Sequence, residues 1–171
     1  MAQINVSGLE IFLANMQKMS NDARAINRGA LGEGAKVAAE EMRNTLEQLP
    51  IRPETVSAED HDRALYGVTA NELTQILDNF GITRFKDTSG GWNTSIGVSG
   101  YVNTHSPMWG NKVPTKLLLA VVENGSVDEN GAQFRKPCHV LKQNESQLEA
   151  AVTEAMQNYI DQAIKKSDLS M

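Results

Sequence analysis

The chain has 171 residues, 40% of them hydrophobic, and a formal net charge of −5 at pH 7, with its basic residues scattered as singles and pairs. Binding to a nucleic-acid backbone needs several convergent cations, so this composition argues against direct contact with DNA or RNA. The N-terminal sequence has no basic leader before a long apolar core, and no stretch is apolar enough to span a bilayer. We therefore expect a soluble protein without a signal peptide, folded as a single domain over residues 1–171.

Two helices are predicted in the N-terminal part. Ser7 and Glu10 have the spacing of a capping box, in which the two side chains bond free backbone N–H groups, so a short helix should cover about residues 8–19. The Ser-Asn-Asp cluster at residues 20–22 is a natural N-cap, and apolar residues recur after it at helical spacing to about residue 48. The sequence thus predicts a short helix, a break and a longer helix.

Three glycines lie close together inside the longer helix, at Gly29, Gly32 and Gly34. Each glycine costs a helix up to ~1 kcal/mol relative to alanine, so their clustering requires a compensating interaction. One explanation is the close approach of another helix or strand to a surface without side chains. The other is a kink or hinge used in assembly, and the sequence leaves both open.

Prolines at positions 50 and 53 end this helix, and residues 50–68 carry little regular pattern, which indicates a flexible excursion. A second capping-box spacing, at Thr69 and Glu72, predicts a short helix. Its apolar residues fall on one face, and Gly81 is the expected end of the helix.

The hydrophobic period changes after this helix. Short runs at residues 82–86 and 92–98 flank a Gly-rich turn and predict a β-hairpin. Residues 101–114 are too interrupted for one element and are predicted to form a flexible loop. The run Lys-Leu-Leu-Leu-Ala-Val-Val at residues 116–122 shows no alternation, so we expect a central strand covered on both faces.

Helical spacing returns from Asn144 to Lys166, where basic residues suit the C-terminal end of a helix dipole. A third flexible segment is expected at residues 126–133, which are polar and acidic. Together the elements predict an α+β fold. A small, mainly antiparallel sheet of three to four strands should pack against the long helix of the N-terminal half and the C-terminal helix.

Residues 122–141 contain the side-chain types of a cysteine-based catalytic centre, with Glu123, Cys138 and His139 close in sequence. A catalytic thiolate needs a nearby imidazolium, but adjacent residues of an extended segment point to opposite sides. We therefore expect Cys138 to fill apolar space and the protein not to be an enzyme. Glu123 should begin the turn out of the apolar strand, and residues 134–141 should dock in extended form on the core or on a neighbouring molecule.

Metal and phosphate binding have little support in the sequence. His61 and His105 lie in different predicted loops, and no second cysteine completes a zinc ligand set. The acidic run Glu-Asp-His-Asp at residues 59–62 could attract a divalent cation, but such runs are usually solvated. The glycine-containing turns lack the lysine and hydroxyl of a phosphate-binding loop. No metal or cofactor is predicted.

Five segments precede the final helix in a distinctive order: GALGEGAKVAAEEM, LTQILDNFGI, WNTSIGVSGY, AVVENGS and FRKPCHVL. This order, over about residues 6–165, resembles the neck and tail-component family of tailed bacteriophages and prophages, small proteins that join head to tail. In that family a Val-Glu-x-Gly turn follows the apolar strand, and a segment with Phe and Pro precedes the last helix. Residues 122–125 and 134–137 occupy those places, although the arginine that family members commonly carry after the proline is missing here.

The resemblance implies a non-enzymatic virion protein, made in the host cytoplasm, that forms an oligomeric ring at the head-tail junction or completes the tail. Its partners would be further copies of itself and neighbouring connector or tail proteins, with no small-molecule substrate, nucleic acid or membrane. Two other functions remain open: a tail terminator that caps the tail tube, and a prophage-encoded adaptor that binds a host protein. The candidate interface residues, whose aromatic members could equally be buried in their own subunit, are Trp92, Tyr101, Trp109, Glu123, Arg135 and Lys136.

Overall fold

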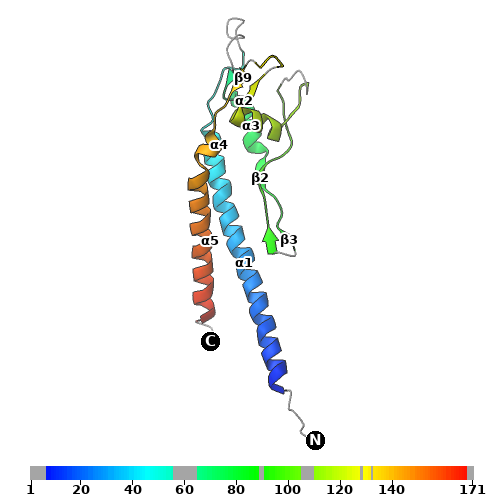
Figure 1. Cartoon of the computed structure of the whole chain (residues 1–171), viewed down its shortest axis with the longest axis vertical. Helices are drawn as coiled ribbons and strands as arrows, with labels where there is room; N and C mark the ends of the chain where they lie inside the picture. Colours follow the sequence, from blue (N-terminus) through cyan, green and yellow to red (C-terminus); the bar gives the residue numbers. More distant parts are fainter. Residues whose placement is uncertain are drawn as a thin grey trace.

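Two long helices packed side by side form a shaft, and small sheets and short helices gather at one end of it, which we call the head (Figure 1). The computed structural model describes residues 7–55, 65–88, 91–104, 110–127, 129–131 and 133–168. The long pair consists of α1 (Ser7–Glu47) and α5 (Glu145–Asp168), and the strands are short and mostly antiparallel. The predicted α+β class and the predicted C-terminal helix are confirmed.

A single helix, α1, replaces the two helices predicted for the N-terminal part. Its 41 residues continue without a break through Ser20, Asn21 and Asp22, so the predicted interruption there was wrong. These residue types favour a cap where the backbone already leaves the helix, but inside a helix each costs only about 0.5 kcal/mol relative to alanine. Because this cluster contains neither proline nor glycine, nothing forces the chain out of the helix.

Glycines of α1 are places where α5 approaches the bare backbone. A Cβ atom at Gly34 would lie 2.7 Å from Cγ of Met156, and one at Gly29 would overlap the ring of Tyr159. Gly32 lies elsewhere on the helix, and a Cβ atom there would meet nothing nearer than 3.9 Å. Close approach, the first of the two explanations offered for the glycines, is therefore confirmed at two of the three positions.

Helix α2 (Ala70–Asp78) begins with the predicted capping box. The hydroxyl of Thr69 accepts the N–H of Glu72 at 3.1 Å, and the carboxylate of Glu72 accepts the N–H of Thr69 at 2.9 Å. The helix ends at Asn79 rather than at Gly81, which lies in the following strand. Asn79 is fixed in place by its side-chain amide, which donates to the hydroxyl of Thr115 at 2.9 Å.

The predicted hairpin forms a two-stranded ribbon in two parts. Strand β2 (Phe80–Ile82) pairs with β5 (Ile96–Val98), and β3 (Lys86–Thr88) pairs with β4 (Gly91–Asn93), both antiparallel. The ribbon runs along α1 on the side away from α5, so α1 lies between the ribbon and α5 (Figure 1).

The run predicted as a central strand is a helix, α3 (Thr115–Asn124), so that prediction was wrong. Pro114 ends the preceding strand at the helix N-cap, and the buried residues Thr115, Leu118 and Val122 recur at spacings of three and four. An apolar run of seven residues fits a buried strand or a short helix equally well by periodicity alone. Three consecutive leucines, which have high helix propensity, favour the helix.

The head contains separate small sheets rather than the single sheet that was predicted. Strand β9 (Gln133–Lys136) lies between β1 (Leu65–Tyr66), which is parallel to it, and β8 (Ser126–Val127), which is antiparallel. A further antiparallel pair joins β6 (Tyr101–Val102) to β7 (Val113–Pro114). Strands this short cannot extend one continuous ladder through the head.

The three segments predicted as flexible excursions each contain some regular structure. Strand β1 lies within residues 50–68, β6 and β7 lie within residues 101–114, and β8 lies within residues 126–133. Residues 56–64 and 105–109, with single positions in the third segment, lie outside the described residues. Where the structure describes these segments they contain short paired strands, and their flexibility stays a prediction.

The core lies in the head, where α2, α3 and the C-terminal end of α1 meet. A one-turn helix, α4 (Val140–Gln143), covers its edge and leads into α5. None of the helices that the structure describes is long and apolar enough to cross a membrane. The buried members of the core are Leu46, Leu49, Val68, Ile76, Val102, Val113, Leu118, Val122 and Cys138.

Candidate functional site

The outer face of the three-stranded sheet in the head presents apolar side chains to solvent. Phe134 is 58% exposed, Val127 is 65% exposed and Tyr66 is 48% exposed. Alternation along β9 places Phe134 and Lys136 on this face and Arg135 on the buried one, and Tyr66 pairs with Lys136 across the parallel ladder. We call Tyr66, Phe134 and Lys136 on this face, together with the exposed Val127 of the edge strand, whose pairing with β9 is interrupted by a bulge, the outer patch.

The buried face of the same sheet holds a carboxylate between two guanidinium groups. The two oxygens of Glu72 each lie 3.2 Å from the donor Nη2 of Arg52, and the hydroxyl of Thr104 donates to Oε1 of Glu72 at 2.7 Å. Nη2 of Arg135 lies 3.9 Å from Oε2 of Glu72, and the side chains of Glu72 and Arg135 are 4% and 6% exposed. One acidic side chain therefore ties α2 to β9 and to two neighbouring segments.

This cluster contains two cations and one anion, so its charge balance depends on Glu72. Burial lowers the pKa of Arg135, and the neighbouring carboxylate of Glu72 opposes that effect. The Nε atoms of Arg52 and Arg135 are buried without a hydrogen-bond partner in the described part of the chain. The sequence revealed Glu72 as a capping residue but not its two partners, because the pairing depends on tertiary structure. The cluster fixes the sheet that carries the outer patch.

Glu123 is also used inside the subunit. Its carboxylate accepts the N–H groups of Leu141 at 3.2 Å and Lys142 at 2.9 Å, so it caps the first turn of α4. It lies in the last turn of α3 and is buried, whereas the sequence placed it in a turn as a candidate contact residue. The turn itself is made by Gly125, whose φ of 77° allows the chain to reverse toward β8.

Cys138 and His139 are placed in different environments. Cys138 is 6% exposed within the core, and burial raises the pKa of its thiol. His139 is exposed and adopts the left-handed conformation, with φ at 54°, just before α4. Backbone hydrogen bonds from Cys138 to Val122 (2.9 Å) and from His139 to Glu123 (3.2 Å) fasten this segment to α3. Residues 138 and 139 are therefore held against α3 by their backbone. Cys138 fills apolar space in the core, as predicted from the sequence.

Metal ligands do not gather in the part of the molecule that can be described. Among the described residues there is no group of three or more His, Cys, Asp or Glu side chains that could hold a metal ion. His61, His105 and the acidic run at residues 59–62 lie outside the described residues.

The remaining candidate contact residues differ in exposure. Tyr101 is 61% exposed, and Lys136 is exposed in the outer patch. Trp92 is partly buried under Arg28, whose guanidinium carbon lies 4.8 Å from the centre of the indole ring. Arg135 is buried in the cluster with Glu72, and Trp109 lies outside the described residues.

A groove of about 560 Å³ lies between the ribbon and α3. Gly81 and Gly97 face each other across β2 and β5, and a Cβ atom added at either one would have no neighbour within 4 Å. One face of the ribbon is therefore bare backbone in open space, with Lys116 and Leu119 of α3 among the groove's other lining residues. Such a surface accommodates a closely packed chain better than a small polar ligand.

Comparison of the chain with family models, with curated proteins and with solved structures finds no match in any of the three. The proposed function therefore rests on the outer patch, the buried cluster and the order of the sequence segments.

Proposed function

We propose that this chain is a structural component of a tailed-phage particle that acts at the head-tail junction by assembling with copies of itself and with neighbouring virion proteins. The observation that carries the proposal is the outer patch, where three large apolar side chains are exposed on one small sheet. Contiguous exposed apolar surface on a small protein marks a contact site. The order of sequence segments that resembles the neck and tail-component family supports the same assignment.

The buried cluster supports this proposal because it explains how so small a sheet could keep its structure when a neighbouring protein binds to the outer patch. Strands of two to four residues have little stability of their own. Arg135 anchors β9 from its buried face, through Glu72, while Phe134 and Lys136 face outward from the same strand. A contact made on the outer patch would therefore be held by α2 and the core.

The proposal is tested by making particles without this protein and supplying variants in its place. Electron microscopy of particles made without the protein should show heads and tails that fail to join. Supplying Phe134→Leu should restore joining, because leucine keeps an apolar contact, and Phe134→Asp should not. Circular dichroism of the two purified variants should show equal folding, because Phe134 is exposed.

Each alternative function predicts a different particle. Tails of irregular length would favour the tail terminator. Normally joined virions without the protein would overturn the proposal and favour the prophage-encoded adaptor, which would then be sought through the host protein that it binds.

A further inference from the structure

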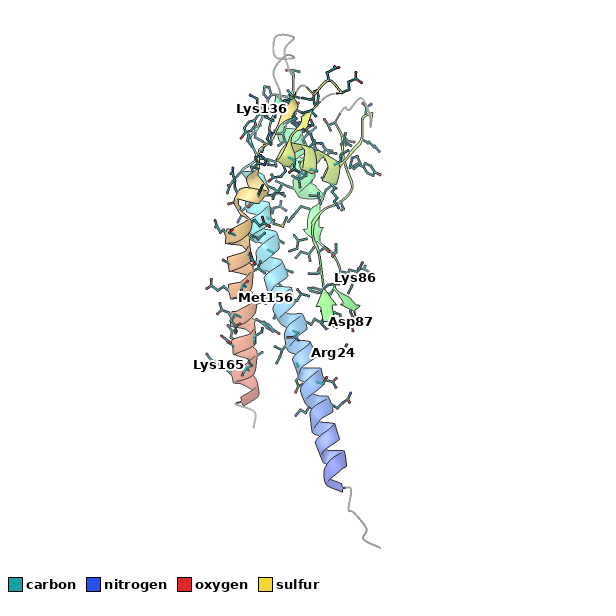
Figure 2. The ribbon with its side chains drawn as sticks, in the orientation of Figure 1. Arg24, Lys86, Asp87, Lys136, Met156 and Lys165 are labelled. Carbon is teal, nitrogen blue, oxygen red and sulfur yellow. The ribbon has the colours of Figure 1, made fainter. Side chains whose placement is uncertain are left out.

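The ribbon side of α1 carries a set of exposed basic residues, which we call the basic face: Arg24, Arg28, Arg84 and Lys86. Arg24 forms a 3.7 Å ion pair with Asp87 (Figure 2), the one acidic residue of the neighbouring strand. Arg28 lies over the ring of Trp92, and the two arginines border a hollow of about 420 Å³ between α1 and the ribbon. The guanidinium groups are thus held in place yet remain accessible.

The opposite side of the shaft is acidic. Helix α5 has no lysine or arginine before Lys165, and it exposes Glu154 and Asp161 on the side away from α1, with Glu149 exposed at the flank; we call these three residues the acidic face. None of these three carboxylates forms an ion pair within the described part of the chain. Glu149 and Glu154 border a shallow hollow of about 540 Å³ with Ala150 in its lining, so a neighbour could approach the helix closely.

The two faces lie on opposite sides of the shaft and overlap along it at Asp161, whereas Glu154 and Glu149 lie nearer the head. Arg24 and Arg28 border the hollow on the ribbon side of α1, and α5 packs on the other side of α1 (Figure 1). The contact between Gly29 and Tyr159 places Arg28 near the level of Asp161. A second copy placed beside the first can therefore bring its acidic face to the basic face without turning end over end.

We propose that the acidic face of α5 in one copy docks against the basic face of the next copy, in a head-to-tail contact that closes a ring. The occupant is a second copy because one chain carries both complementary charges on opposite sides, the arrangement that a heterologous ring contact requires. The inference rests on the proposed function, for which it supplies the self-contact. Because the charges are exposed, the contact is weak in isolation and sensitive to salt.

The test uses three full-length proteins and analytical ultracentrifugation. The wild-type chain should associate more strongly as NaCl falls from about 1 M to about 0.01 M, because the Debye length grows from about 3 Å to about 30 Å. Arg24→Glu/Arg28→Glu makes the basic face acidic on balance, because Asp87 adds to the two glutamates, and Glu154→Lys/Asp161→Lys makes the acidic face basic on balance. Each variant should therefore have a self-association constant at least roughly tenfold lower than that of the wild-type chain. An equimolar mixture of the two variants should regain association, because opposite charges then meet at every contact.

A matched control is Glu129→Lys, the same charge change in the connection between β8 and β9, which should leave association unchanged. Thermal unfolding followed by circular dichroism checks that each variant is folded. An unfolded variant could not restore association in the equimolar mixture. A wild-type chain that stays monomeric in low salt overturns the inference, as does a mixture no more associated than its parts. If the mixed variants do not associate but heads and tails fail to join without the protein, the proposed contact is wrong and the proposed function stands. If the mixed variants associate but virions join normally without the protein, the proposed function is wrong and the contact stands.

Discussion

Replacing Glu72 with glutamine tests whether one carboxylate holds the head together. Glutamine has nearly the same size and can still accept the N–H of Thr69 in the capping box, but it removes the charge and replaces one of the two accepting oxygens with an NH2 donor. It leaves the buried guanidinium group of Arg135 and the partly buried one of Arg52 without a counter-charge. Removing one partner of a buried ion pair costs about 3–5 kcal/mol, mainly because the remaining charge stays desolvated.

A loss of this size is a large share of the roughly 5–15 kcal/mol that stabilises a typical domain. Urea unfolding followed by circular dichroism should give a free energy of unfolding about 3–5 kcal/mol lower for Glu72→Gln, and the Tm should fall by roughly 6–20 °C. The control is Glu47→Gln, which breaks the half-exposed 3.5 Å pair with Arg43 and should cost less than about 1 kcal/mol. If Glu72→Gln costs no more than the control, the cluster does not hold the head together.

Two further predictions concern packing and pH. Gly34→Ala should lower the free energy of unfolding by about 1 kcal/mol, because overpacking against Met156 outweighs the gain in helix propensity, whereas Gly32→Ala, whose Cβ meets nothing nearer than 3.9 Å, should raise it by up to about 1 kcal/mol. Thermal unfolding of the two variants measures these changes in stability. If both variants were stabilised, or both destabilised, the packing described for α5 would be contradicted. Because burial raises the pKa of Cys138 in the folded chain, the unfolded chain loses its thiol proton first as the pH rises above about 8.5. The free energy of unfolding should therefore fall above that pH, and urea titrations should show a weaker fall for Cys138→Ala; equal slopes for the two proteins would refute the assignment.

Local sequence signals identified the elements whose ends or faces are set locally. The pair Thr69 and Glu72 begins a helix because two side chains satisfy free backbone groups within one turn, and the structure contains both bonds. Helix α5 was predicted because its apolar spacing persists over many residues. The glycine cluster of α1 indicated that a tertiary compensation was needed, and close packing, one of the two explanations left open, is what the structure contains at Gly29 and Gly34.

Features set by distant residues were not predictable. The run at residues 116–122 is helical because Pro114 and its buried partners determine its environment, and its apolar character alone fits either state. Glu123 and Arg135 were both expected at a surface, yet one caps α4 and the other lies against Glu72. A charged residue gives no sign in sequence of whether a partner far along the chain will bury it.

The packing of α5 on the glycines of α1 joins residues that are remote in sequence, such as Gly34 and Met156. Contacts at such separation form slowly, because a long loop must close before the contact is made. A helix interrupted by glycines has little stability without its partner, so the middle of α1 becomes rigid only when α5 has folded back onto it. Helix α1 is translated before α5, so its middle should gain full protection against hydrogen exchange only after α5 has been made and has packed against it.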